Sequence, residues 1–311
     1  MKAVLSLGAL ALLLASAPAL AQTIAITDVK LAGADAKSIT LVIEDGKISA
    51  MGPTVKAPKG ATVIAGSSKI VSPGLIATNT RLGMVEINAV GYTNEGRFNG
   101  GHPVHAAFRV TDGYNPASMV IGVARNGGIT STITAPSGGL ISGQSAWLTL
   151  GEGGVAENTV RESTAMHVVL GRRATDQGEG SRGRALQKLR ALFDDATHYG
   201  KNKAAYNRGQ TRKYGAEHLD LEALQLVLKR TIPLVVQVDR KSDISAVLKL
   251  AKEFKIRVVL QGATEAWMLA DELAAAKVPV ILNPKDNLPQ SFDQTRVVDD
   301  PATRLAAAGV T

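Results

Sequence analysis

The first part of the chain alternates between apolar and polar residues with the two-residue period of β-strands. Three stretches between Thr23 and Gly74 follow this pattern and are rich in β-branched residues: TIAITDVKLA, SITLVIEDGKISAMG and ATVIAGSSKIVSPG. The Asp45-Gly46 pair between two apolar runs is typical of a two-residue hairpin turn. We therefore predict that residues 22–71 form the N-terminal part of a small β-sandwich domain, which is too small to close by itself.

After Pro73 the pattern changes to short apolar runs separated by segments with helical periodicity, which predicts parallel β/α units. The predicted strands are residues 70–76, 129–134, 146–150, 167–170, 234–238, 257–260 and 278–282. The predicted helices are residues 115–126, 184–199, 219–229, 243–254, 265–276 and 301–308. Ser242 is the predicted N-cap of the fourth of these helices.

Seven strands with intervening helices predict an α/β fold, in which residues 72–311 form an incomplete TIM-like (β/α)8 barrel. A helical pattern ends close to Thr311, where an eighth strand would be expected to begin. Residues 172–215 lack the strand pattern and are predicted to be a basic helical excursion from the barrel.

The N-terminal residues 1–21 have the pattern of a cleavable signal peptide. Lys2 is followed by an apolar core, and Ala19-Leu20-Ala21 matches the small-residue pattern of a cleavage site. No later segment is long and apolar enough to span a membrane. We therefore expect a periplasmic or secreted protein, and the absence of cysteine excludes disulfides and thiolate metal sites.

The net charge of +8 is concentrated in one part of the chain. Between Arg172 and Lys213 there are eleven Lys and Arg residues against four Asp and Glu residues, which gives +7. This segment has few aromatic residues and no recognisable nucleic-acid module, so we expect no nucleic-acid partner. Its two interpretations are a solvated helical excursion and a surface that contacts anionic components of the cell envelope.

Three segments carry a resemblance to a known family: KIVSPGLIATNTRLG, VARNGGITSTITAPSGGLISGQSAWLTL, and the stretch from IPLVVQVDRKSD to VPVILNP. In this order they resemble the amidohydrolase superfamily, and most closely its imidazolonepropionase-like and prolidase-like periplasmic members. The resemblance covers most of the chain from about residue 24. It implies a barrel whose site lies at the carboxyl ends of the strands.

In that family the first strand ends in PGLIDxHxH, and both histidines bind a metal ion that activates water for hydrolysis. The resemblance aligns Ala77 with the aspartate, and Asn79 and Arg81 with the two histidines. It aligns Gln237 with the histidine of the fifth strand, and Glu265 lies near the position of the histidine of the sixth. Zinc or another divalent metal is present in active members, but no cofactor is expected here. Amides bind transition metals poorly, and a guanidinium cannot be deprotonated.

Other residues are candidates for the same barrel mouth. The backbone donors of the GGLISGQSA loop suit an anionic group or an oxyanion. We expect Arg81 to occupy the vacated metal region and to form an ion pair with a nearby carboxylate, either Asp239, Glu265 or Glu86. The candidate pocket residues are Asp239, Glu86, Ser142 and Gln144.

Two functional hypotheses follow from these residues. The first is an exported amidohydrolase-family protein without a metal, which acts as a pseudoenzyme or binds an unidentified small molecule. The second is an active metal-dependent hydrolase that cleaves C–N bonds of small amides or peptides with a rebuilt site. In the second case the expected ligands are Asp239, Glu265 and either His102 or His105. His167 is expected to pack in its strand.

Overall fold

The computed structural model describes residues 23–33, 38–98, 101–174, 176–283 and 288–311. The chain divides into two compact units between Pro73 and Gly74. The predicted signal peptide at residues 1–21 lies outside the described residues. Within the described part of the chain, no helix has the length and apolar character needed to cross a membrane.

The first unit is a single β-sheet with strand order β3-β2-β1-β4, and β5 also pairs with β1. Strands β2 and β3 form the predicted hairpin, since Asp45 and Gly46 both have positive φ angles, 50° and 72°. Strands β4 and β5 run parallel to β1. This sheet is the partial sandwich predicted from the sequence. Its strands are β1 (Ile24–Leu31), β2 (Ile39–Glu44), β3 (Lys47–Gly52), β4 (Thr62–Ala65) and β5 (Ile70–Val71).

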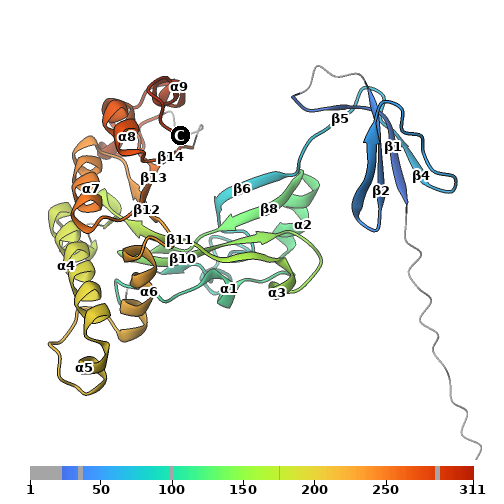
Figure 1. Ribbon diagram of the computed structural model, residues 1–311. Helices are drawn as coiled ribbons and strands as arrows, with labels where there is room; N and C mark the ends of the chain where they lie inside the picture. Colours follow the sequence, from blue (N-terminus) through green and yellow to red (C-terminus); the bar gives the residue numbers. More distant parts are fainter. Residues whose placement is uncertain (1–22, 34–37, 99–100, 175, 284–287) are drawn as a thin grey trace, which may run out of the picture. The chain divides into compact units, whose positions relative to one another are not determined.

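The second unit is built on a seven-stranded sheet with order β14-β13-β12-β11-β10-β8-β6, as Figure 1 shows. Together with its helices it forms the predicted incomplete barrel, with β6 and β14 at its edges. The strands are β6 (Leu75–Thr80), β8 (Ile129–Thr134), β10 (Ile141–Thr149), β11 (Thr159–Val169), β12 (Leu234–Val238), β13 (Val258–Gly262) and β14 (Val280–Ile281).

The direction of β10 corrects the prediction that all seven strands are parallel. Strand β10 is antiparallel to both of its neighbours, β8 and β11, whereas the other adjacent pairs are parallel. Only residues 135–140 connect β8 to β10. A parallel crossover needs about a dozen residues or more, so this connection is too short and the chain turns back instead.

Helices cover one side of the sheet between β11 and β14, where Figure 1 shows α4, α6, α7 and α8. The larger core cluster fills this layer with side chains such as Met166, Val168, Leu189, Leu224 and Leu260, all at most 1% exposed. The α-helices are α1 (Val110–Gly113), α2 (Met119–Asn126), α3 (Val155–Asn158), α4 (Arg182–Lys201), α5 (Lys203–Asn207), α6 (His218–Leu228), α7 (Lys241–Phe254), α8 (Ala270–Ala276) and α9 (Pro301–Ala307).

Short elements complete the second unit. Five 3-10 turns lie within the described chain: η1 (Gly91–Thr93), η2 (Gly171–Ala174), η3 (Asp176–Gly178), η4 (Ala266–Leu269) and η5 (Phe292–Gln294). A two-stranded sheet joins β7 (Arg97–Phe98) to β9 (Ser137–Gly138). Further predicted details were wrong. The predicted strand 70–76 is divided between β5 and β6, which belong to different sheets. Helix α7 begins one residue before Ser242, so the capping position belongs to Arg240, and the helix predicted from residue 265 starts as the 3-10 turn η4.

Candidate functional site

The inner face of the barrel carries polar side chains at the carboxyl ends of three adjacent strands. Along β11, β12 and β13, alternate residues such as Met166, Val236 and Leu260 belong to the core under the helices. The residues between them point to the other face because strand side chains alternate. In this register Gln237 pairs with Val169 on one side and with Gln261 on the other. His167 lies two residues before Val169, on the same face.

Strand β6 brings Asn79 and Arg81 to this region through a β-bulge. Ala77 pairs with Thr132 and Thr80 pairs with Thr134, so β6 has one more residue than β8 between the two pairs. Asn79 is in the left-handed conformation, with φ of 55°, which asparagine adopts more readily than most residues. A bulge re-aims side chains and is frequent beside functional sites. The chain turns directly after β6, where the Met84 N–H donates to the Arg81 carbonyl at 2.9 Å.

The β7–β9 pair adds Arg97 and Ser137, which are paired with each other in register. Gly138 is required at this point because it has a φ angle of 90° and a side chain there would meet the Phe98 carbonyl oxygen at 2.1 Å. The Ser142 hydroxyl donates to the Gly138 carbonyl at 2.7 Å and ties the start of β10 to the same loop. The glycine-rich loop therefore positions β7 against the barrel mouth.

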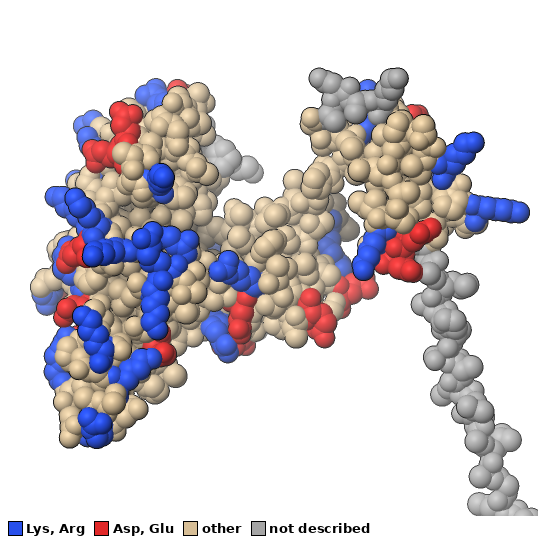
Figure 2. All heavy atoms as spheres, viewed as in Figure 1, with Lys and Arg blue, Asp and Glu red and all other residues tan. Residues whose placement is uncertain are grey.

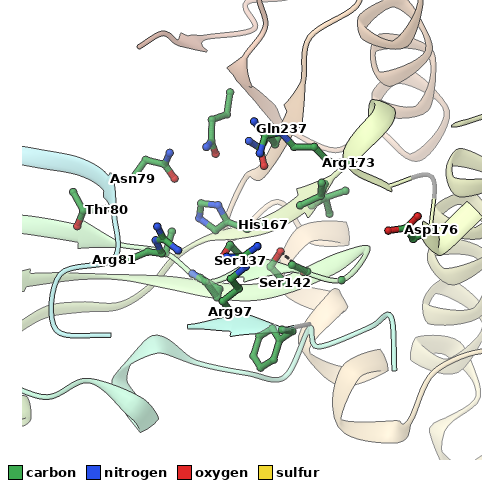
Figure 3. A pocket seen from close by; sticks show the side chains of 18 residues that line it. Asn79, Thr80, Arg81, Arg97, Ser137, Ser142, His167, Arg173, Asp176 and Gln237 are labelled. Carbon is green, nitrogen blue, oxygen red and sulfur yellow. Dashed lines mark hydrogen bonds between the residues drawn. The ribbon is translucent and has the colours of Figure 1, made fainter. Parts of the chain in front are cut away.

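These elements enclose a cavity of about 720 Å3. Asn79, Arg81 and Gln237, which the family resemblance places at the positions of metal-binding histidines, all line it. In Figure 3, Asn79, Arg81, Gln237 and Arg173 surround His167, and Asp176 lies to one side. The lining residues that the sequence did not indicate as site residues include Arg97, Arg173, His167 and Gln261.

The remaining candidate residues do not all reach this cavity. Ser142 lines it, whereas Asp239 lines a smaller cavity of about 170 Å3 that shares Arg173 and Gln237 with the first. Gln144 is buried, where its Nε2 donates to the Ala106 carbonyl at 2.9 Å and its Oε1 accepts from Ser163. Its polar atoms are therefore used within the fold.

The expected ion pair of Arg81 is not formed, and each proposed carboxylate has other hydrogen-bond partners. Glu86 accepts hydrogen bonds from Asn115 at 3.1 Å and from Ser118 at 2.9 Å. Asp239 accepts from the Thr264 hydroxyl at 3.0 Å, and Glu265 accepts from the Lys241 backbone N–H at 2.7 Å. Within the described chain, no carboxylate lies within the 4.0 Å ion-pair distance of Arg81.

The cavity contains a buried histidine that is neutral at physiological pH. His167 is 7% exposed, and burial lowers its pKa to about 4. Neither ring nitrogen has a hydrogen-bond partner among the described residues, and Nε2 is fully buried. In a loop nearby, His105 stacks on Phe98 at 4.0 Å, and burial lowers the pKa of His105 below its usual range. His105 therefore supports Phe98 in β7.

The residues at the cavity do not fit the metal that the family resemblance implies. A hydrolytic zinc site needs about three imidazole or carboxylate ligands, and the positions concerned hold two amides and a guanidinium. His167 supplies the one imidazole among the described residues that line this cavity. Among the residues that the structure describes, no three His, Cys, Asp or Glu side chains come together as a metal site requires.

The positive charge of the basic excursion is partly balanced by acidic residues that are distant in the sequence and close in the structure. Figure 2 shows Lys and Arg side chains gathered over α4 and α5, with acidic side chains among them. Three of these cations pair with carboxylates from outside the segment: Arg182 with Asp243 and Asp293, Arg190 with Glu253, and Lys203 with Glu222. Lys201, Arg208 and Lys213 are exposed and form no ion pair with a described carboxylate.

Comparison with known proteins identifies the fold. No known family profile matches the chain, and no curated protein sequence is significantly similar to it. The crystal structure of an amidohydrolase from Thermotoga maritima superposes with a TM-score of 0.80 at 22% identity, over 92% of this chain and 76% of that one.

Two further structures are more distant. N-isopropylammelide isopropylaminohydrolase from Burkholderia multivorans matches with a TM-score of 0.42 at 16% identity, over 93% of this chain and 73% of its own. A prolidase complexed with N-methylphosphonate-L-proline matches with a TM-score of 0.41 at 10% identity, over 93% of this chain and 77% of its own. These two scores are too low to support a conclusion. The first comparison shows that this chain has the fold of the Thermotoga maritima amidohydrolase.

Proposed function

We propose that the protein is a member of the amidohydrolase superfamily that has lost its metal centre and binds a small molecule in the cavity at the barrel mouth. One observation carries this proposal: Asn79, Arg81 and Gln237 replace the expected metal-binding histidines and line the same cavity. Amide groups are weak ligands for transition metals, and the fixed charge of Arg81 repels a cation. The cavity volume of about 720 Å3 lies within the range of ligand pockets.

The alternative is a hydrolase with a rebuilt metal site, and the positions of its candidate ligands argue against it. Glu265 is 7% exposed and accepts the backbone N–H of Lys241. Asp239 lines the smaller cavity, and His105 stacks on Phe98. Among the described residues, no three side chains of the metal-binding types come together, so these groups do not supply a common set of ligands.

Metal content and hydrolytic activity separate the two functions. The full-length protein is purified, incubated with Zn2+ or Mn2+, desalted and analysed for metal, and then assayed with small amides and dipeptides. We expect substoichiometric metal and no metal-dependent hydrolysis. The double variant Asn79→His/Arg81→His serves as the comparison, because it restores two imidazoles and should retain more metal. One equivalent of metal in the unmodified protein, together with hydrolysis, would overturn the proposal.

We also infer that the protein is exported, because residues 1–21 have the charge, apolar core and cleavage pattern of a signal peptide. Expression of the whole chain in a Gram-negative host tests this inference. The expected product is found in the periplasmic fraction and begins near Gln22. A protein that stays in the cytoplasm with Met1 intact would contradict it.

A further inference from the structure

Three arginine side chains line the cavity without a carboxylate partner. Arg81, Arg97 and Arg173 contribute to its wall, and none of them has an ion pair with a described carboxylate. Some other arginines of the same unit are paired, since Arg109 contacts Asp112 and Glu162, whereas the exposed Arg208 forms no ion pair with a described carboxylate. Among the described lining residues, Asp176 is the single residue with a carboxylate. The wall therefore has a formal excess of two positive charges.

Arg97 and Arg173 are exposed and remain hydrated, so the cost of this excess falls mainly on Arg81. Like charges repel more strongly near a protein surface than in bulk water, because the effective dielectric constant is lower. Arg81 is half-buried, so part of its hydration has been lost. Guanidinium groups bind carboxylates through two parallel hydrogen bonds, which makes arginine suited to recognition of planar anions. An anion in the cavity would relieve the repulsion between the three cations.

His167 gives a second, independent indication that the cavity has a ligand. This side chain is more than nine-tenths buried, lines the cavity, and makes no hydrogen bond with the described chain. Buried polar groups in folded proteins are almost always satisfied. Its neutral imidazole adds no charge to the wall, and because Nε2 is fully buried, Nδ1 is the ring nitrogen left to contact a ligand.

We propose that the cavity binds a small organic dianion of the dicarboxylate class, held by Arg81, Arg97 and Arg173 with His167 and the neighbouring amides of Asn79 and Gln237 as neutral contacts. The excess of two charges matches a dianion, and the planar fork of each guanidinium matches a carboxylate. This inference rests on the proposed function, since a bound metal in the same cavity would compete for the carboxylates.

Succinate and butyrate are the probes, because they have four carbons each and differ by one carboxylate. Binding to the full-length, EDTA-treated protein is measured by isothermal titration calorimetry at low salt. We expect succinate to bind at least about tenfold more tightly than butyrate, and added salt to weaken succinate binding. Arg81→Gln should weaken succinate binding at least about tenfold, and Arg81→Lys should weaken it less. Arg208→Gln is the matched control, since it removes an exposed arginine outside the cavity.

The folding of each variant is monitored through the fluorescence of Trp147 and Trp267, both of which lie in the second unit. If Arg81→Gln does not fold, Arg173→Gln replaces it, because Arg173 is exposed in the turn η2. The proposal is overturned if succinate produces no signal up to about 10 mM, if Arg81→Gln and Arg208→Gln bind it equally, or if inorganic phosphate binds and succinate does not. Metal analysis of untreated protein tests the proposed function separately, so the two failures can be told apart.

Discussion

The backbone N–H of Lys241 donates to the carboxylate of Glu265 at 2.7 Å, which joins the start of α7 to the loop after β13. Lys241 is the first residue of α7, where backbone N–H groups have no partner within the helix. A carboxylate at this end also interacts favourably with the helix dipole. Glu265 therefore stabilises a helix instead of contributing to the cavity.

The variant Glu265→Ala should lower the free energy of unfolding by about 1 to 2 kcal/mol, because it removes the hydrogen-bond acceptor at the start of α7. Urea denaturation followed by tryptophan fluorescence measures the change in the second unit, which contains both tryptophans. Glu272→Ala is the control, since Glu272 is exposed on α8 and forms no ion pair with a described residue. Equal unfolding midpoints for both variants would contradict the capping role.

The left-handed backbone of Asn79 makes a prediction about which residues β6 tolerates there. Asn79→Val should destabilise the second unit by about 1 to 2 kcal/mol, because a β-branched side chain is strained at a φ angle of 55°. Asn79→Gly should have little effect, since glycine adopts this conformation freely and the Asn79 side chain makes no hydrogen bond with a described residue. The thermal unfolding midpoints of Asn79→Val and Asn79→Gly measure this difference. Equal midpoints would show that the backbone at this position is not strained by a β-branched residue.

The regular elements were predictable because their patterns are local. The β2–β3 hairpin followed from Asp45-Gly46, and the apolar runs at β8, β12 and β13 matched the observed strands closely. The direction of β10 was missed because its strand was predicted only over residues 146–150, which left eleven residues after β8. The observed strand begins at Ile141, so the connection has six residues and is too short for a parallel crossover.

The site could be predicted only in part. Asn79, Arg81 and Gln237 were found because they lie at the ends of strands that carry a recognisable pattern. Arg97 and Arg173 lie in short turns and a two-residue strand, where no periodicity indicates which way a side chain points. The pairing of Glu265 with α7 depends on tertiary contacts between loops that are 24 residues apart, which sequence patterns do not report.

Gly138→Ala should weaken both the fold around β7 and the binding of succinate. A methyl group at this position would meet the Phe98 carbonyl oxygen at 2.1 Å, so the β7–β9 pair has to separate and Arg97 moves with it. We expect a loss of stability of about 1 to 3 kcal/mol and weaker calorimetric binding. Gly183→Ala in the first turn of α4 is the control, because a methyl group there meets no atom closer than 3.7 Å. If Gly138→Ala has the same stability and the same succinate affinity as this control, the close approach of Gly138 to the Phe98 carbonyl does not limit either property.

If the basic excursion contacts an anionic envelope surface, we expect its exposed and unpaired cations to make that contact. Arg182 is unsuitable for a charge-reversal test because it pairs with Asp293, whose side chain is 5% exposed. We expect the triple variant Lys201→Glu/Arg208→Glu/Lys213→Glu to lose salt-dependent retention on phosphatidylglycerol vesicles, since each basic residue near such a surface contributes about 1 kcal/mol.

A matched triple variant in the first unit, Lys56→Glu/Lys59→Glu/Lys69→Glu, changes the net charge by the same amount. It should keep most of its retention if the excursion forms the contact. Equal losses in the two triple variants would show that retention follows net charge, and retention of both would exclude the contact.

His167 should make the stability of the second unit depend on pH. The imidazole has a pKa of about 4 in the folded protein and an ordinary value of 6.5 otherwise, so the unfolded chain binds an additional proton between these values. The stabilisation is complete above pH 6.5 and is lost as the pH falls towards 4, by about 3 kcal/mol in total. Urea titrations at pH 7 and pH 4.5 should show a smaller decrease for His167→Leu than for the unmodified protein, because leucine has no proton to bind. His218→Gln controls for the loss of a histidine at an exposed position. If His167→Leu and the unmodified protein lose the same stability, the imidazole of His167 is not buried as a neutral group, and its place as a neutral contact in the cavity fails with it.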